Sequence, residues 1–453
     1  MRIDTRITPE QLTLSAQRVI SLAAEKSLEL NKTWDATHGA PVFTAEGKYT
    51  TRGWTQWTHG FQFGIPLLVY EVTDQPEFLA IGRHKTLEHM PVHLTHRGVH
   101  DHGFNIVSTY GALARLMHKG LIPFNEWELA TYQTALKVSA AVQAMRWSET
   151  AYGHGYIYSF NGPQSLFCDT LRTLRSLALG HGLGHRLHSE RDAEISLLDR
   201  LVQHIRTTAR FNVFFGDGRD IYDHPGRVAH ESIFNPADGC YRCPSSQQGY
   251  SPFTTWTRGL AWILCGSAEL LEWIESRPSG EFDPYGGLEE IRHLLRRMAK
   301  VTADYYIDGL TALDGIPFWD DGAPGLVYLE GWRDKNSVPE NPWEPVDSSA
   351  AAISAQGLIR LGLLLKEDRY LQAGLTAAQT LFAEPYLCTN SSHQGLLLHS
   401  VYHRPNGWDH IPANSKIPQG ESSMWGDYHL VELSVLILSL HPGSKLYCFF
   451  PDE

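Results

Sequence analysis

The apolar residues of this chain recur with a helical period in about twelve stretches, and this pattern limits the possible fold more than any other feature. The stretches begin near residues 8, 56, 76, 102, 124, 164, 188, 253, 284, 347, 366 and 427. Segments rich in Gly, Pro and Asp interrupt them, as expected of loops. Strand signals are sparse and are expected only within two long irregular segments, 210–252 and 308–346. Twelve helices with alternating short connections predict an all-α (α/α)6 barrel, with six helical hairpins in a toroid around a cavity.

We expect residues 1–453 to form a single domain. No low-complexity segment and no Pro/Ser linker divides the chain. Of its 453 residues, 42% are hydrophobic, which is enough for a large core. The formal net charge of -12 disfavours general nucleic-acid binding, because neutralising phosphates requires a basic surface.

The cysteines and the N-terminal segment indicate the cellular compartment that we expect for the protein. Only Cys240 and Cys243 have a metal-like spacing, and a second such pair is missing, so structural zinc is not expected. A local disulfide between these two is possible, but six scattered cysteines are more typical of reduced thiols. The segment Met1–Arg6 lacks the apolar stretch of a signal peptide, and the longest apolar run, Leu433 to Leu440, is too short to span a membrane. We therefore expect a cytoplasmic protein with no membrane partner; the oligomeric state is not indicated.

Two aspartates carry the strongest chemical signal. Asp101 lies in Val-His-Asp-His-Gly-Phe-Asn and Asp169 in Ser-Leu-Phe-Cys-Asp-Thr-Leu-Arg, each at an expected helix start. Asp is a favoured N-cap, so capping is the simpler explanation for either one alone. A pair of carboxylates in a chain with 13 Trp is, however, typical of enzymes that act on sugars.

Trp-rich motifs accompany the two aspartates. Trp57 opens Trp-Thr-His-Gly-Phe, and the segment 256–262 reads Trp-Thr-Arg-Gly-Leu-Ala-Trp. Arg258 and Trp262 are four residues apart, so they share one face of a helix. An Arg beside a Trp platform suits a carboxylated sugar ring, because it combines bidentate contact with stacking. Both Trp side chains could instead belong only to the core.

These motifs together resemble the unsaturated glucuronyl hydrolases of glycoside hydrolase family 88. The resemblance runs from about Trp54 to Glu432 and includes, in the family's order, the His-Asp-x-Gly-Phe turn and the Gln-Gly-Tyr segment. Asp347 with the Ser-Ser-Ala-Ala-Ala that follows it, and Trp-Gly-Asp-Tyr at 425–428, complete the series. The resemblance implies release of a 4,5-unsaturated uronic acid from oligosaccharides by hydration of its double bond, with no cofactor and no metal.

The resemblance also implies roles for individual residues. Asp169 would be the general acid and then the base that activates water, and Asp101 would be the second essential carboxylate. The other expected substrate contacts are His100, His230, Gln247, Arg258, Trp262, Trp57, Ser422 and Ser423.

The chain departs from the family at several of these positions. Gln247 replaces a His that commonly reaches the active site, and a Gln cannot titrate. Gln62 replaces a Trp, and Asp169 is followed by Thr-Leu-Arg in place of an Asn/Met-rich turn, while Phe160 takes the place of a Trp. These departures leave the substrate contacts and the parent polysaccharide open.

Three alternatives follow from these departures. An unsaturated rhamnogalacturonyl hydrolase is the closest, although the segment 256–262 favours the glucuronyl type. A sugar epimerase fits less well, because such sites use paired histidines. A non-catalytic sugar-binding relic of the same fold is the third alternative. His93, His96, His100 and His102 also have a spacing that can bind zinc, although such clusters are more often polar or capping.

Overall fold

The computed structural model describes residues 1–53 and 56–451, so Trp54 lies outside the described residues. Its main helices are α1 (Pro9–Thr33), α2 (His59–Thr73), α3 (Pro76–His89), α4 (Pro91–Leu94), α5 (His102–Asn105), α6 (Ala112–His118), α7 (Glu126–Met145), α8 (Thr170–Thr173), α9 (Arg175–Gly182), α10 (Leu197–Phe211), α11 (Thr257–Glu275), α12 (Leu288–Tyr305), α13 (Ser348–Leu365), α14 (Asp368–Leu381) and α15 (Met424–Leu438). A π-helical segment, Val107–Gly111, joins α5 to α6.

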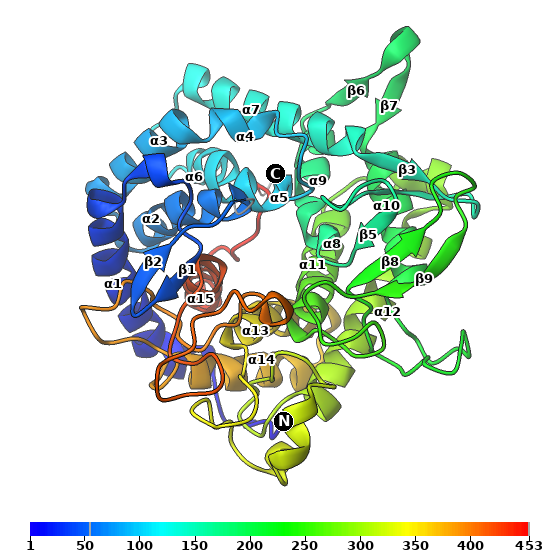
Figure 1. The fold of residues 1–453 in the computed structure, drawn as a ribbon. Helices are drawn as coiled ribbons and strands as arrows, with labels where there is room; N and C mark the ends of the chain where they lie inside the picture. Colours follow the sequence, from blue (N-terminus) through cyan, green and yellow to red (C-terminus); the bar gives the residue numbers. More distant parts are fainter. Residues whose placement is uncertain (54–55, 452–453) are drawn as a thin grey trace.

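The helices form a closed ring in which inner and outer positions alternate (Figure 1). The inner helices are buried on nearly every side: α2, α5 with α6, α8 with α9, α11, α13 and α15. The outer helices α1, α3, α7, α10, α12 and α14 each keep a solvent-exposed face. Helix α1 packs against α15 and α2, which closes the ring. Within the described residues the predicted (α/α)6 barrel is confirmed.

The strands are short and more widely distributed than the sequence indicated. They are β1 (Phe43–Ala45), β2 (Lys48–Thr50), β3 (Trp147–Glu149), β4 (Gly155–Ile157), β5 (Ser165–Phe167), β6 (Arg186–His188), β7 (Glu194–Ser196), β8 (Glu231–Phe234) and β9 (Tyr241–Ser245). Only β8 and β9 lie in the segment 210–252, so the expectation that strands occur only in the two long loops is wrong. Three-residue strands give too short a period-2 pattern to recognise in a sequence. The antiparallel order β5-β8-β9 matters most, because β5 leads directly to Asp169.

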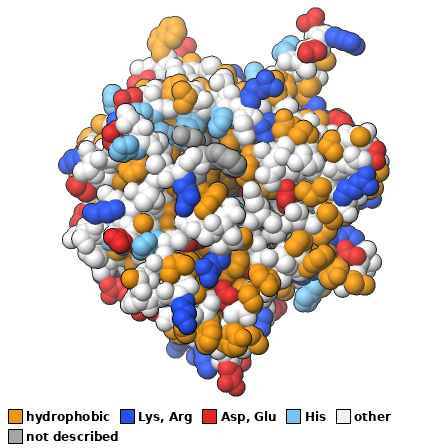
Figure 2. Space-filling model, viewed as in Figure 1, with side chains coloured by type: hydrophobic (Ala, Val, Ile, Leu, Met, Phe, Trp, Pro, Cys, Tyr) orange, Lys and Arg blue, Asp and Glu red, His pale blue; other side chains and the backbone are white. Residues whose placement is uncertain are grey.

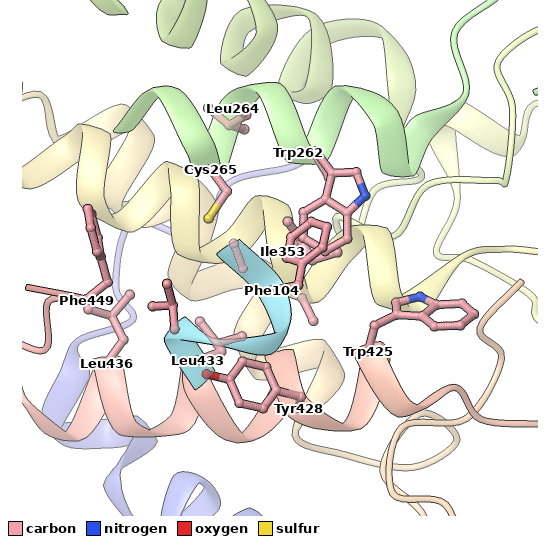
Figure 3. Close-up of a cluster of buried hydrophobic side chains, with 14 of the residues drawn as sticks. Phe104, Trp262, Leu264, Cys265, Ile353, Trp425, Tyr428, Leu433, Leu436 and Phe449 are labelled. Atoms are coloured by element: carbon pink, nitrogen blue, oxygen red, sulfur yellow. The ribbon is translucent and has the colours of Figure 1, made fainter. Parts of the chain in front are cut away.

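The inner helices pack around aromatic side chains rather than an open channel. Figure 3 shows Phe104, Trp262, Trp425 and Tyr428 converging from α5, α11 and α15. The rings of Phe104 and Trp262 lie 4.9 Å apart between centroids. Helix α13 is apolar and long enough to cross a membrane by composition, but 83% of it is buried inside the protein, as in a core helix.

Below these rings the inner helices carry a buried network of ion pairs. Arg172, one turn after Asp169, donates to both Oε atoms of Glu269 at 3.0 Å and to Glu432 at 2.9 Å. The guanidinium of Arg172 also lies 5.6 Å from the centre of the Trp262 ring. Arg172 thus explains one departure from the family pattern: it joins α8 to α11 and α15. Removing one partner of such a buried pair typically costs about 3–5 kcal/mol of stability.

Candidate active site

A cavity of about 380 Å³ opens at the end of the barrel where the long loops gather. Its lining combines seven Trp, Tyr or Phe side chains with two carboxylates and one arginine. The lining residues are Gly53, Trp57, His96, Gly98, Val99, His100, Asp101, Phe104, Phe160, Asp169, Gln247, Gln248, Trp256, Arg258, Trp262, Tyr402, His403 and Trp408. Seven of the ten predicted site residues therefore line this cavity: Asp101, Asp169, His100, Gln247, Arg258, Trp262 and Trp57.

Both aspartates stand at the N-cap position of a short inner helix, as the sequence indicated. Asp101 precedes α5 and Asp169 precedes α8, but neither side chain makes a capping hydrogen bond. Both are largely buried, with 7% and 8% of the residue exposed. The capping explanation therefore fails for both, and the carboxylates are left to face the cavity.

His100 lies between the two carboxylates. Its Nε2 is 3.1 Å from Oδ1 of Asp169 and 3.8 Å from Oδ1 of Asp101. The ring is held by Phe160, stacked at 6.2 Å, and by Phe167, edge-on at 5.5 Å. One imidazole thus links the pair, and its position is fixed by aromatic packing.

The three groups shift each other's pKa. Burial, together with the charge of Asp169, raises the pKa of Asp101 to about 6 against the opposing effect of His100. For Asp169, burial is outweighed by His100, which lowers the pKa. The pKa of His100 is raised because the two carboxylates overcome the effect of burial. Of the two carboxyl groups, Asp101 is therefore the one that binds a proton more readily, whereas the resemblance assigns the acid role to Asp169.

Aromatic rings form the walls beside the carboxylates. Trp57 is half-buried and stacks on Trp425 with 5.3 Å between centroids. Trp262 is 2% exposed and packs against Phe104. Trp408 lies at the other side of the cavity, 5.4 Å from the Tyr402 ring. Such faces suit stacking against a sugar ring.

Arg258 lines the cavity, but its hydrogen bonds run within the protein. Nη1 donates to Oδ2 of Asp347 at 3.0 Å and to the carbonyl of Val401. Nη2 donates to Oε1 of Gln248 and to the carbonyl of Tyr402, both at 2.9 Å. Arg258 therefore holds Gln248 and the 401–402 loop in place, in addition to presenting a positive charge to the cavity.

His230 contacts the backbone of Gln247 and does not line the cavity. Its Nδ1 accepts from the backbone N–H groups of Gln247 and Gln248, at 2.9 and 3.3 Å. Burial lowers its pKa to about 3, so the ring is neutral and carries its proton on Nε2. His230 thus stabilises the Gln247–Gln248 turn by accepting hydrogen bonds from its backbone.

The structure does not bring the predicted substrate contacts Ser422 and Ser423 to the cavity. Both are fully buried and outside the cavity lining. The Ser422 hydroxyl donates to Asp427 at 2.5 Å, and the Ser423 hydroxyl caps α15 by accepting from Gly426 N–H. The α15 N-terminus uses both hydroxyls, which leaves neither for a substrate.

The histidines near Asp101 are engaged in separate contacts. His93 pairs with His59 at 3.2 Å, and His102 binds the Ser139 hydroxyl at 2.7 Å. Among the described residues, no three His, Cys, Asp or Glu side chains converge as metal ligands. Cys240 and Cys243 are both free thiols.

Sequence reasoning missed several cavity residues. Gln248 and Trp256 are the first residues of the recognised Gln-Gly-Tyr and Trp-Thr-Arg motifs, so the motifs could have identified them as site residues. Tyr402, His403 and Trp408 lie in a loop without any motif and reach the cavity only through folding. Asp409, which accepts from the Tyr402 and His403 N–H groups, holds this loop.

We expect Arg258→Ala to raise KM and also to lower the melting temperature. The substitution releases Gln248 and the 401–402 loop, and it leaves the buried Asp347 without its ion-pair partner. Arg258→Lys is the matched control: it keeps the charge beside Asp347 but cannot hold both carbonyls, so stability should recover more than KM. An unchanged KM in Arg258→Ala would exclude Arg258 from the substrate site.

No family model matches the chain. Among curated proteins it is 25% identical over 427 residues to the unsaturated glucuronyl hydrolase of Bacillus sp. (strain GL1), covering 90% of this chain and 92% of that protein. It is 21% identical to the unsaturated chondroitin disaccharide hydrolase of Streptococcus agalactiae, covering 83% and 80% of the two chains.

Solved structures agree with the sequence comparison. An unsaturated glucuronyl hydrolase specific for heparin superposes with a TM-score of 0.71 at 18% identity, covering 93% of this chain and 96% of that one. The Bacillus sp. GL1 enzyme gives a TM-score of 0.68 at 21% identity, covering 96% and 99%. In sequence and in fold, over nearly its whole length, the chain is similar to the unsaturated glucuronyl hydrolases.

Proposed function

We propose that this protein is a glycoside hydrolase of the unsaturated glucuronyl hydrolase type, family 88, which releases a 4,5-unsaturated uronic acid from the non-reducing end of lyase-generated oligosaccharides. The observation that carries the proposal is the pair Asp101 and Asp169, joined by His100 at the wall of an aromatic cavity. Such a site combines a proton donor, a nearby negative charge and aromatic surfaces on which a sugar ring can stack.

The chemistry is a hydration. A carboxyl proton is transferred to C4, and the electron pair of the C4=C5 bond forms the new C–H bond. The positive charge that develops at C5 is shared with the ring oxygen and is stabilised by the remaining carboxylate. Water, after losing a proton to a carboxylate, adds to C5. The resulting hemiketal opens, and the aglycone leaves with a proton as the sugar rearranges to a keto acid.

We assign this proton transfer to the aspartate pair. By resemblance Asp169 delivers the proton and then activates water, whereas Asp101 is the carboxyl group with the higher pKa in the substrate-free protein. The two groups form a coupled system with His100, so one proton serves all three. Gln247 and Gln248 lie where the sugar's polar groups would meet them.

The partner is accordingly an unsaturated uronic-acid oligosaccharide. A related structure from Streptococcus agalactiae, with a TM-score of 0.63, is complexed with dGlcA-GalNAc6S. On the face shown in Figure 2, acidic and basic side chains are interspersed, in keeping with a small-molecule substrate rather than nucleic acid. We further propose a cytoplasmic location, which the sequence composition and the free thiols support.

The test is the loss of far-UV absorbance when the protein meets a panel of lyase-generated unsaturated disaccharides. Hydration removes the conjugated C4=C5–carboxylate chromophore, so we expect absorbance to fall with at least one glucuronyl substrate. Turnover only of unsaturated rhamnogalacturonan fragments would favour the rhamnogalacturonyl alternative. Calorimetric binding without any turnover would identify a sugar-binding relic and contradict the proposal.

A further inference from the structure

Trp408 lies at the mouth of the active-site cavity, in the segment 402–409, which no sequence motif marks. The groups assigned to the chemistry are more deeply buried: Asp101, Asp169 and Trp262 are 7%, 8% and 2% exposed. Trp408 is only half-buried, and Gly98, which also lines the cavity, is exposed. The cavity therefore has a buried end that holds the carboxylates and an open end that an indole borders.

Ring contacts and an arginine hold Trp408 in place. The rings of Tyr402 and His403 lie 5.4 and 4.6 Å from the indole between centroids, tilted by 48° and 54°, so neither is stacked flat on it. The guanidinium of Arg52 lies over the indole, 4.9 Å from the ring centre, and Arg52 Nη2 donates to the Trp408 carbonyl at 3.3 Å. Arg52 thus joins the segment between β2 and α2 to the 402–409 segment across the cavity mouth.

Three aromatic side chains of the cavity lining are half-buried: Trp57, Phe160 and Trp408. Phe160 is stacked on His100, which links the two carboxylates, and Trp57 contacts Phe104 at 5.9 Å. Both therefore belong to the surroundings of the carboxylate pair, where the unsaturated ring must bind. Trp408 instead contacts Tyr402 and His403, so it is available for a part of the substrate farther from the carboxylates.

The proposed reaction fixes the direction in which an oligosaccharide enters. The C4=C5 bond of the terminal sugar must reach Asp101 and Asp169 at the buried end, and the rest of the chain is attached at C1, across the ring from C4. The second sugar therefore points toward the open end, where Trp408 lies. The cavity of about 380 Å³ falls in the range of pockets that enclose whole small ligands, about 300–1,000 Å³, so it has room beyond one ring.

We propose that Trp408 is the platform on which the second sugar of the oligosaccharide stacks, and that Arg52 is a positioning residue that holds this platform. The inference rests on the proposed function, because it concerns the sugar that leaves when the unsaturated uronic acid is released. The carbon-bound hydrogens of the pyranose pack on the indole, and its hydroxyl groups stay in water at the open end. The preferred substrates are then oligosaccharides of at least two sugars, rather than glycosides with a small aglycone.

Two substrates separate the second sugar from the first. One is a lyase-generated disaccharide of unsaturated glucuronic acid and an N-acetylhexosamine, and the other is the methyl glycoside of the same unsaturated acid. Trp408→Ala should raise KM for the disaccharide about five- to tenfold with little change in kcat, because stacking holds the sugar equally before and during the reaction. For the methyl glycoside, KM should stay within about twofold of wild type. An equal rise in KM for both substrates would overturn the inference.

Trp343→Ala is the matched control. Trp343 is also partly exposed, at 43%, and packs against a tyrosine, Tyr328, at 4.5 Å between centroids. It lies outside the cavity lining, so its removal should leave KM unchanged for both substrates. A disaccharide KM that rises as much in Trp343→Ala as in Trp408→Ala would contradict a specific role for Trp408.

Arg52 is tested by conservative rescue. Arg52→Gln removes the cation over the indole, so we expect KM for the disaccharide to rise about threefold, while KM for the methyl glycoside stays unchanged. Arg52→Lys retains the charge and should recover part of this loss. A merely structural role of Arg52 would lower the melting temperature without distinguishing the two substrates, and that result would overturn its assignment as a positioning residue.

Calorimetry on Asp169→Asn makes the test independent of turnover. The disaccharide should bind this variant more tightly than the methyl glycoside does, and adding Trp408→Ala should remove the difference without changing the affinity for the methyl glycoside. Equal affinities of Asp169→Asn for the two ligands would overturn the inference. The expected binding pattern without any turnover by wild type would count against the proposed function and not against the role of Trp408.

Discussion

Asp169→Asn is expected to lower kcat by about a thousandfold or more while leaving the fold intact. Asparagine has nearly the same shape, but it can neither transfer the proton nor activate water. Asp169 makes no capping hydrogen bond to α8, so its replacement removes no structural contact of that helix. The measurement is kcat on the unsaturated disaccharide identified by the absorbance assay, with circular dichroism as the check on folding.

Two further variants complete this experiment. Asp101→Asn should lose activity to a similar extent, because it removes the second carboxylate beside His100, which would stabilise the positive charge that develops at C5. Asp314→Asn is the matched control: its carboxylate is also part-buried, accepts from Ser337 and lies outside the cavity lining. Near wild-type turnover by Asp169→Asn would show that the acid has been assigned to the wrong residue.

The second large effect is a loss of stability in mild acid. At least eight buried imidazoles have a pKa lowered to about 3 or 4, mainly by burial: His59, His93, His102, His204, His230, His399, His403 and His429. Each is neutral in the folded protein but takes up a proton below about pH 6.5 once unfolded. Their contribution to stability is therefore complete above pH 6.5 and is lost as the pH falls toward 4.

At least six carboxyl groups act in the opposite direction, including Asp314 and Asp427, whose pKa is raised by burial. Burial raises the pKa of Asp101 and Asp409 to about 6 and of Glu272 and Asp320 to about 7. These groups bind protons in the folded state first, so they add stability as the pH falls through 7 to 4. The lowered imidazoles outnumber these carboxyl groups, so unfolding takes up protons below about pH 6.5 and the free energy of unfolding falls with pH.

We consequently expect the free energy of unfolding to fall by a few kcal/mol between pH 7 and pH 5, which is a large part of a typical domain stability of about 5–15 kcal/mol. The measurement is the urea midpoint by circular dichroism at pH 7, 6 and 5. His399→Asn tests the cause: His399 has φ 66°, which Asn tolerates, and its Nδ1 accepts from Gly420 N–H, which an amide oxygen can replace. This variant should reduce the pH slope by about one proton, and a midpoint independent of pH would contradict the explanation.

Local sequence patterns predicted the framework well. The period of apolar residues located the helices, because burying one face of a helix leaves a signal within the helix itself. The starts of α1 at Pro9, α3 at Pro76 and α13 at Ser348 lie within one residue of their expected positions. The motifs also placed Asp101 and Asp169 at helix starts, because N-cap geometry depends on neighbouring residues.

Partners distant in the sequence could not be predicted in the same way. Arg258 was expected to bind a sugar carboxylate, yet its donors are used by Gln248, Asp347 and the carbonyls of 401–402. Ser422 and Ser423 carry the right chemistry in the right region, but they face the α15 N-terminus. Only the folded chain decides which of several possible acceptors a donor meets.

By itself the sequence determined an all-α ring, two carboxylates at helix starts and an aromatic-rich setting, since each of these is encoded within a dozen neighbouring residues. The tertiary structure alone decided that His100 links Asp101 to Asp169 and that Tyr402, His403 and Trp408 line the cavity. The physical reason is that proton sharing and cavity shape depend on side chains brought together from separate helices, and the closure of long loops leaves no periodic or compositional trace in the sequence.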